Sequence, residues 1–292
     1  MSLINGSTRW VLFLGSGGQS EDRHILDLAF GLQCLESAGV NLSNIFIYVD
    51  GPNRTLISQL ISNGSKNPPT TKETAYFFSD LDTNDHENLV MFITGHGGID
   101  GIEAPTPITP YALLGRIKST PKLKHAIIYL GQCHAGIFNY IGAGRKNKDE
   151  PEVILVGATN LHESISSNTK ESLASGDASW IANIFLLHLF KWISNPVDVD
   201  GDGRRTVIDS YKYAGALSNN SSKSMKMGTF INSFDLHRKW ETAKEDYKKS
   251  PSLQAQLNLQ AAEDQYAQIL GVRYIHQECW ILNAIPAQHI EF

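Results

Sequence analysis

Short apolar runs alternate with longer segments of mixed polarity along most of the chain. Five of these runs are rich in Val, Ile, Leu and Phe, and they cover residues 10–14, 45–49, 89–94, 126–130 and 153–157. Runs of this length are typical of strands that are buried on both faces of a sheet. We therefore expect five strands in the interior of a sheet.

The segments between and after these runs carry helical signals. Residues 23–38 place leucines on one face and end before Gly39, as helix C-termini commonly do. Residues 109–119 begin with Thr-Pro, a usual N-cap followed by proline at the first helical position. The strongly apolar residues 175–192 are expected to form one helix against the sheet. Strands alternating with helices predict an α/β fold, with a mostly parallel sheet flanked by helices on both faces.

The pattern changes after about residue 235. Residues 236–270 are polar and rich in Lys, Glu, Gln and Ala, which favours one or two long exposed helices. We therefore divide the chain into a domain of residues 1–235 and a helical C-terminal extension of residues 236–292. The extension is expected to be a packing appendage; the alternative is a docking element for a regulatory protein partner.

Composition and charge then exclude several classes of protein. The net charge is −5 and no stripe of Lys and Arg is present, so we expect no nucleic-acid partner. The first apolar run is too short for a signal peptide, and the longest, residues 181–190, contains polar side chains, so we expect no membrane segment. Three widely spaced cysteines, Cys34, Cys133 and Cys279, argue against a disulfide framework and for a reducing, cytoplasmic location.

Candidate chemistry lies where two of the predicted strands end. The run 89–94 continues into Gly-His-Gly-Gly, which contains His96, and the run 126–130 continues into Gly-Gln-Cys, which contains Cys133. Because ligands bind outside the carboxyl ends of strands in open parallel sheets, we expect both sequences at one rim of the sheet.

A cysteine beside a histidine at such a rim predicts nucleophilic catalysis. The thiolate of Cys133 would attack, and His96 would move the proton. A helix beginning just after Cys133 would lower the pKa of its thiol. The backbone N–H groups of Gly97 and Cys133 would stabilise an oxyanion. This chemistry requires no cofactor.

The two sequences resemble motifs of the legumain and GPI-transamidase family of cysteine peptidases, which are relatives of caspases and gingipains. The histidine motif is Phe-Ile-Thr-Gly-His-Gly-Gly at 92–98, and the cysteine motif is Tyr-Leu-Gly-Gln-Cys-His-Ala-Gly at 129–136. Val-Ile-Leu-Val-Gly-Ala-Thr at 153–159, followed by His-Glu-Ser at 162–164, is also similar. The resemblance covers about residues 8–215. It implies a caspase-like fold and an endopeptidase that acts on protein or peptide substrates.

The resemblance also implies a pocket for the residue before the cleaved bond. In that family an Arg and an Asp line this pocket, and carried over they are Arg23 and Asp177. His24 follows Arg23, and Ser164 partly matches a Ser-rich pocket loop. From the residues alone, Arg23 is equally a surface cation, His24 a first-turn residue and Asp177 a helix N-cap. A pocket with both charges favours Asn in the substrate, ahead of Asp and of Lys or Arg.

The chain departs from the family pattern at three places. The acidic residue that legumains carry two positions before the nucleophile is Gly131 here, and the Asn that precedes their Arg-His region is Glu21. The Ser-rich loop is matched only at Ser164 and Ser166. Peptidase chemistry is therefore supported better than specificity for Asn.

A separate acidic motif follows the apolar segment. Asp198, Asp200, Asp202 and Asp209 occupy positions 1, 3, 5 and 12 of a calcium-binding EF-hand loop, with Gly203 at position 6. This spacing predicts a Ca²⁺ site. The alternative is an Asp-rich turn that caps a helix over residues 207–217.

Three other interpretations of the function of this chain remain open. An α/β-hydrolase with a Cys nucleophile is one, because residues 131–135 nearly match its nucleophile turn, although that fold places the histidine after the nucleophile. An inactive caspase-like scaffold that binds partners through residues 236–292 is another. A nucleotide-binding fold would use the glycines of residues 15–18, but the third glycine of that motif is replaced by Ser20.

Overall fold

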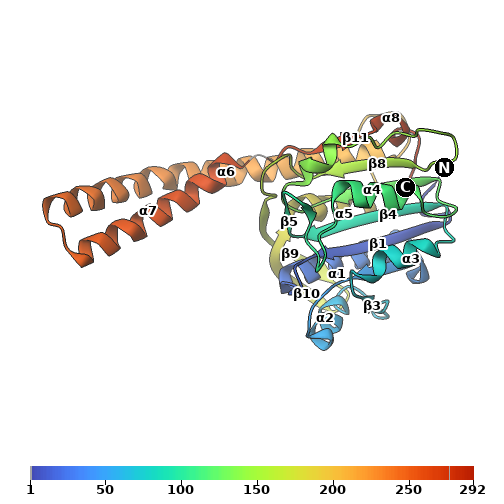
Figure 1. The fold of residues 1–292 in the computed structure, drawn as a ribbon, viewed down its shortest axis with the longest axis horizontal. Helices are drawn as coiled ribbons and strands as arrows, with labels where there is room; N and C mark the ends of the chain where they lie inside the picture. Colours follow the sequence, from blue (N-terminus) through green and yellow to red (C-terminus); the bar gives the residue numbers. More distant parts are fainter. Residues whose placement is uncertain (1, 276) are drawn as a thin grey trace. The chain divides into compact units, whose positions relative to one another are not determined.

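The computed structural model describes residues 2–275 and 277–292, and its largest sheet has seven strands (Figure 1). The strands of this sheet are, in chain order, β1 (Thr8–Gly15), β2 (Ile45–Tyr48), β3 (Thr71–Lys72), β4 (Asn88–Gly95), β7 (His125–Leu130), β8 (Glu152–Gly157) and β11 (Trp280–Leu282). Their order across the sheet is β11-β8-β7-β4-β1-β2-β3, and only β11 runs antiparallel to its neighbour. All five predicted strands are confirmed, and so is the mostly parallel α/β class.

The central strands are buried on both faces because helices cover each face. Every residue of β1 and β4 is buried. Along β1, Trp10 and Leu12 pack into one core, whereas Val11 and Phe13 pack into the other, as the alternation of side chains in a strand requires. Because each face of the sheet packs into a core, both sets of alternating side chains are apolar, and the strands appear in the sequence as continuous apolar runs.

The helices around the sheet fall into two layers. Helices α1 (Asp22–Ser37) and α5 (Ile184–Ser194) contribute to the core that contains Trp10. Helices α3 (Tyr76–Asp82) and α4 (Pro110–Lys118) contribute to the other core and lie in front of the sheet in Figure 1. The remaining short elements are η1 (Leu42–Asn44), α2 (Arg54–Ile61), β5 (Gly97–Gly98), β6 (Gly101–Ile102), η2 (Ala135–Tyr140) and α8 (Ala284–Ala287). This arrangement confirms the predicted helices on both faces and is consistent with the expected caspase-like architecture.

Two helix boundaries agree closely with the sequence signals. The Thr109 side chain accepts a hydrogen bond from the Ala112 N–H at 3.2 Å, with Pro110 at the first helical position of α4. Helix α1 ends at Ser37, and Gly39 adopts a φ of +90°, a conformation that glycine reaches without steric cost.

The prediction of one helix over residues 175–192 is wrong. Residues Ser166–Leu173 form β9 and Gly176–Asn183 form β10, which pair as an antiparallel hairpin; α5 begins only after Asn183. In β10 the buried Trp180 and Ala182 flank the exposed Ile181, a period of two that belongs to a strand. The Asn183 side chain accepts a hydrogen bond from the Leu186 N–H and so fixes where the helix starts.

The chain folds into two compact units, whose boundaries differ from the expected division at residue 235. The first unit is Met1–Ser218 with Gln277–Phe292, and the second is Asn219–His276. Helix α6 (Val207–Lys249) begins in the first unit and continues into the second. Residues 277–292 do not belong to a helical extension, because they return to the first unit and supply β11.

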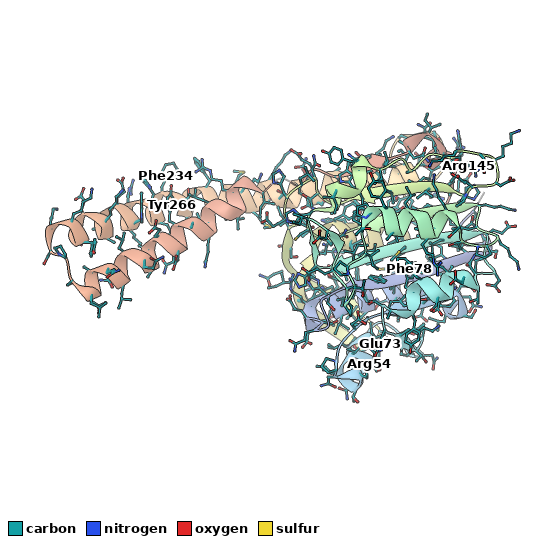
Figure 2. All side chains as sticks on the ribbon, viewed as in Figure 1. Arg54, Glu73, Phe78, Arg145, Phe234 and Tyr266 are labelled. Atoms are coloured by element: carbon teal, nitrogen blue, oxygen red, sulfur yellow. The ribbon has the colours of Figure 1, made fainter. Side chains whose placement is uncertain are left out.

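The second unit consists of most of α6 and of α7 (Leu253–Tyr274), so of the one or two long helices expected here, two are present. The rings of Trp240, on α6, and Tyr266, on α7, stack with centroids 5.8 Å apart. Figure 2 labels Tyr266 and also Phe234, an α6 side chain that is half exposed. Among the described residues, none of the helices combines the length and the apolar character needed to span a membrane.

Candidate active site

The histidine and cysteine motifs lie at the ends of two neighbouring parallel strands. Strand β4 pairs with β7 up to Ile93 and Leu130, and the Gly131 N–H then donates to the Ile93 carbonyl at 2.8 Å. His96 and Cys133 follow directly beyond this last pair. The prediction that both motifs share one rim of the sheet is therefore confirmed.

Gly97 brings the two motifs into backbone contact. A Cβ atom at this position would lie 2.5 Å from the Cys133 carbonyl oxygen and 2.4 Å from the Gln132 side chain. No side chain fits into such a space, so glycine is required here. The residue after His96 thus lies directly against the backbone of Cys133, as the proposed oxyanion pair Gly97 and Cys133 requires.

Glu21 holds the imidazole of His96. The Nε2 atom of His96 lies 2.7 Å from Glu21 Oε1, while Arg23 Nε donates to Glu21 Oε2 at 2.6 Å. The hydrogen bond from Arg23, supported by the one from His96, lowers the pKa of Glu21 to about 2 against an opposing effect of partial burial. Glu21 is therefore ionised at any physiological pH. Its position leaves Nδ1 as the His96 nitrogen that faces no hydrogen-bond partner among the described residues.

Sequence reasoning treated Glu21 only as a departure from the family pattern. The signal that could have found its role is its place just before Arg23, at the start of α1, because the N-terminus of α1 follows the carboxyl end of β1. In a parallel sheet that end lies on the same rim as the end of β4, which precedes His96.

The thiol of Cys133 is held by the loop that follows β8. The Ser164 N–H donates to Cys133 Sγ at 3.3 Å, and the His134 N–H donates to the His162 carbonyl at 2.8 Å. Burial raises the pKa of Cys133 above its ordinary value, although the Ser164 N–H opposes this shift. The expectation that a following helix lowers this pKa is therefore wrong. Only the short 3-10 helix η2 follows, and desolvation of the thiolate outweighs it.

Ser164 contacts Cys133, and Arg23 lies near enough for its charge to act on the thiol; their pocket role stays a prediction. Arg23 Nη1 donates to the Ser166 hydroxyl at 3.3 Å, and the charge of Arg23 favours the Cys133 thiolate. Ser164 contacts Cys133 through its N–H, and its hydroxyl accepts from Asn183 Nδ2 at 3.4 Å. One cation and two hydroxyls thus gather on this side of Cys133.

Asp177 does not join this group, so the predicted pairing of Arg23 with Asp177 in one pocket is wrong. Asp177 pairs across the hairpin with Ser172, whereas Ser166, the partner of Arg23, pairs with Asn183 at the opposite end. Ser166 and Ser172 are six positions apart along β9, which corresponds to about 20 Å. Asp177 is exposed and binds Lys170 at 2.9 Å. This contact, with a hydrogen bond from Ser172, lowers its pKa.

Asp27 is a buried carboxylate that the sequence analysis missed. It is 3% exposed and accepts hydrogen bonds from Thr94 Oγ1 and Trp180 Nε1, both at 2.8 Å. His24 Nδ1 lies 3.5 Å from the same carboxylate. Asp27 follows His24 by one helical turn on the buried face of α1, and an acidic residue on such a face is the signal that could have found it. It fixes His24, the end of β4 and the hairpin relative to one another.

His24, the remaining predicted pocket residue, is almost fully buried and lies behind His96. It is 3% exposed, and its ring meets the ring of His96 edge to face, with centroids 5.3 Å apart. It contacts His96 and Asp27, and its burial leaves it out of reach of a substrate side chain.

The Asp-rich loop uses its carboxylates internally. Asp198 accepts from the N–H groups of Gly201 and Gly203 at 2.7 and 2.8 Å. Asp209 is fully buried and accepts from the Thr206 N–H and hydroxyl, at the first turn of α6. Asp198, Asp200 and Asp202 bring carboxylate oxygens within 4.8 Å of one another, and Asp209 does not join them. The loop therefore caps α6, and calcium binding stays a prediction.

Neither family models nor curated proteins supply a function for this chain. No model of a known protein family matches this chain, and no curated protein matches it either. Any functional assignment therefore rests on the geometry of Cys133, His96 and Glu21.

Proposed function

We propose that this chain is a cysteine endopeptidase in which Cys133 is the nucleophile and His96 transfers the proton. The observation that carries the proposal is the convergence of three groups at one rim of the sheet. Cys133 and His96 follow adjacent parallel strands whose extensions touch at Gly97, and the ionised Glu21 is hydrogen-bonded to His96. A nucleophile, a base and a group that orients the base are the parts that covalent acyl transfer needs.

The protonation states suggest how the reaction would proceed. Burial keeps Cys133 as a thiol at rest, so Nδ1 of His96 removes its proton as the sulfur attacks the peptide carbonyl carbon. The carboxylate of Glu21 stabilises the imidazolium that forms, through the bond to Nε2. The oxyanion accepts from the N–H groups of Gly97 and Cys133.

Collapse of the tetrahedral intermediate then breaks the C–N bond. The imidazolium of His96 gives its proton to the leaving amine, and a thioester on Cys133 remains. Water attacks this thioester while His96 takes a proton from the water. The proton then returns to the Cys133 sulfur as the acid product leaves. No redox step and no further reactant are involved.

The substrate side chain before the cleaved bond is proposed to be polar. Arg23, Ser164 and Ser166 are the groups beside Cys133, and they offer a cation and two hydroxyls. A side chain with an oxygen acceptor, Asn or Asp, suits this set, whereas Lys or Arg would meet the Arg23 guanidinium. Asp177 lies too far away to attract a basic substrate residue.

The alternative functions fit the site less well. An α/β-hydrolase needs a histidine that follows the nucleophile, whereas His96 precedes Cys133, and the next residue, Gly97, lies against the cysteine motif. A nucleotide fold would place phosphates at the start of α1, where Glu21 and Asp22 provide negative charge. A scaffold without activity leaves the paired Glu21 and His96 unexplained.

A reducing, cytoplasmic setting is part of the proposal, because the nucleophile must stay a free thiol. Cys34, Cys133 and Cys279 are all free. Burial raises the pKa of Cys34 to about 12 and that of Cys279 to about 11, so both should be inert.

Labelling with peptidyl electrophiles tests the proposal directly. A peptidyl acyloxymethyl ketone ending in Asn or Asp should modify Cys133 alone, as located by mass spectrometry of tryptic fragments. The modification should require His96, so His96→Ala should stay unlabelled while Cys279→Ala labels normally. Normal labelling of His96→Ala would instead favour another base, as in the α/β-hydrolase alternative. Equal labelling of unfolded protein would mean that the fold contributes no activation.

A further inference from the structure

Glu21, His24 and His96 form a cluster of potential metal ligands at the same rim. One ligand atom from each of the three lies within 4.8 Å of the other two. They come from two segments only, the start of α1 and the residue after β4. In the part of the chain that the structure describes, the only other such group of three consists of the carboxylates in the Asp-rich loop.

The second observation is a buried nitrogen that has no partner. His24 is 3% exposed, and its Nε2 atom makes no hydrogen bond to any described residue. Its Nδ1 atom lies 3.3 Å from Thr94 Oγ1 and 3.5 Å from Asp27 Oδ2. These oxygens favour the proton on Nδ1, which leaves a lone pair on Nε2. A buried polar atom without a partner is costly, and this one belongs to a residue of the cluster.

The surroundings of His24 match those of a metal-binding histidine. Such a histidine commonly gives its second N–H to a carboxylate, which fixes the ring and raises its basicity. Asp27 supplies that carboxylate, and Trp180 Nε1 and the Asn183 N–H hold Asp27 in turn. The ligand that is deepest in the protein is therefore already oriented.

We propose that Glu21, His24 and His96 bind a divalent transition metal ion, with Zn²⁺ as the best fit. Two imidazoles and one carboxylate are a common zinc ligand set that leaves a fourth position for water. Calcium and magnesium prefer all-oxygen ligands and do not suit two imidazoles. The exposed Glu21 side chain needs only to turn from His96 toward the ion.

The ion would inhibit the peptidase, and this consequence rests on the proposed function. Catalysis requires His96 with a proton on Nε2, facing Glu21, and a lone pair on Nδ1. Coordination through Nε2 moves that proton to Nδ1, because a neutral imidazole carries only one. Nδ1 can then no longer take the proton of Cys133, and Glu21 is occupied as a ligand. The site is therefore a reversible inhibitory switch that responds to free zinc.

The test separates this site from ordinary binding of zinc by the catalytic thiol. Isothermal titration calorimetry of tag-free Cys133→Ala protein with ZnCl₂ should give one site per chain. Glu21→Gln and His24→Gln in the same background should each weaken binding at least about 10-fold, the usual effect of losing a ligand or its orientation. His86→Gln is the matched control, because His86 is paired with Asp85 and not with this cluster. Substitution with Co²⁺, whose visible absorption is strong in tetrahedral sites, would report the geometry expected for zinc.

The outcomes distinguish this inference from the proposed peptidase activity. Unchanged zinc binding in His24→Gln, or loss of binding in Cys133→Ala alone, would overturn the cluster. Because His24 is buried, the exposed Glu21→Gln variant keeps the test decisive if His24→Gln does not fold. Zinc binding does not require turnover, so it remains measurable in a chain that cleaves no peptide. If the chain does cleave peptides, ZnCl₂ should inhibit it over the same concentration range as it binds.

Discussion

The rim of the sheet that carries Cys133 and His96 and the Asp-rich loop both gather side chains of the kind that bind ligands, but they differ in what those side chains already bind. In the loop, Asp198 and Asp209 are hydrogen-bonded to backbone N–H groups, and Asp200 pairs with Lys212 at 2.7 Å. At the rim, His24 keeps a buried nitrogen without a partner, and a glycine is required between the two motifs. Sequence patterns suggested both regions: the ends of two strands for the rim, and the spacing of aspartates for the loop. The difference teaches that a buried polar atom without a partner, or two backbone segments held in close contact, indicates a binding site better than a pattern in the sequence does.

The largest expected effect separates activity from stability at the rim. Cys133→Ala and His96→Ala should each lower kcat for peptide hydrolysis by at least about 1,000-fold, because each removes a reacting group. Both side chains are partly exposed, so the melting temperature should change little. Hydrolysis of a fluorogenic peptide and thermal denaturation measure the two effects. Near wild-type hydrolysis by Cys133→Ala would mean that the rim is not the active site.

Glu21→Gln should have a smaller effect on the same reaction. The amide still reaches His96 but cannot stabilise its imidazolium, so we expect kcat to fall by about 10- to 100-fold, with KM nearly unchanged. Glu36→Gln, a change on the same helix outside the site, is the control. Steady-state kinetics of both variants give the comparison. Equal rates for Glu21→Gln and wild type would reduce the Glu21–His96 contact to a surface ion pair.

In the loop, the expected effect falls on stability instead of activity. Asp209→Ala removes a fully buried carboxylate that caps α6 and should lower the free energy of unfolding by about 2–3 kcal/mol. Asp200→Ala removes an exposed ion pair and should change it by at most about 0.5 kcal/mol. Urea denaturation measures both. Similar values for the two variants would contradict the assignment of the loop as a cap.

Calcium sharpens the same comparison. Three exposed carboxylates without Asp209 predict weak binding, with a dissociation constant of about 0.1–1 mM. Millimolar CaCl₂ should raise the melting temperature of the wild type and not that of Asp200→Ala. Submicromolar binding by the wild type would show that Asp209 leaves the helix and joins the ion.

The smallest expected effect is the acid dependence of stability at Glu21. Its pKa is lowered from 4.5 to about 2 in the folded chain, so its contribution is fully present above pH 4.5. That contribution is lost as the pH falls from about 4.5 toward 2. Because the side chain is half exposed, the loss should be modest. Urea titrations of wild type and Glu21→Gln at several pH values should show a shallower acid decline in the variant; parallel declines would contradict the lowered pKa.

The sequence predicted those parts of the fold whose signals are local. The five apolar runs became strands, and Thr109 and Gly39 marked helix ends, because burial and capping depend on neighbouring residues. The hairpin β9–β10 was not predicted, because the apolar residues of β10 run directly into those of α5 and together look like one helix. Trp180 is held as a strand residue by Asp27, which is 153 positions away. Residues 277–292 were misplaced for the same reason, since pairing of β11 with β8 is a long-range contact.

For the candidate site too, the sequence predicted the residues that depend on local signals and missed those that depend on long-range packing. Cys133, His96 and Gly97 were found because strand ends in a parallel sheet share a rim. The roles of Glu21 and Asp27, and the distance of Asp177 from the site, depend on which strand or helix packs beside the rim. No local signal in the sequence specifies that packing. Family resemblance placed Asp177 in the pocket, but the hairpin register moves it to the far end.

The antiparallel strand β11 has a consequence for how the first unit is completed during synthesis. Until residues 280–282 leave the ribosome, β8 is an uncovered edge strand, and such edges favour association with other chains. The same late segment carries Gln277, whose Oε1 accepts the N–H of Ile165, next to the Ser164 that holds the Cys133 thiol. The nascent chain can therefore complete the loop that contacts the Cys133 thiol only after the second unit has been made.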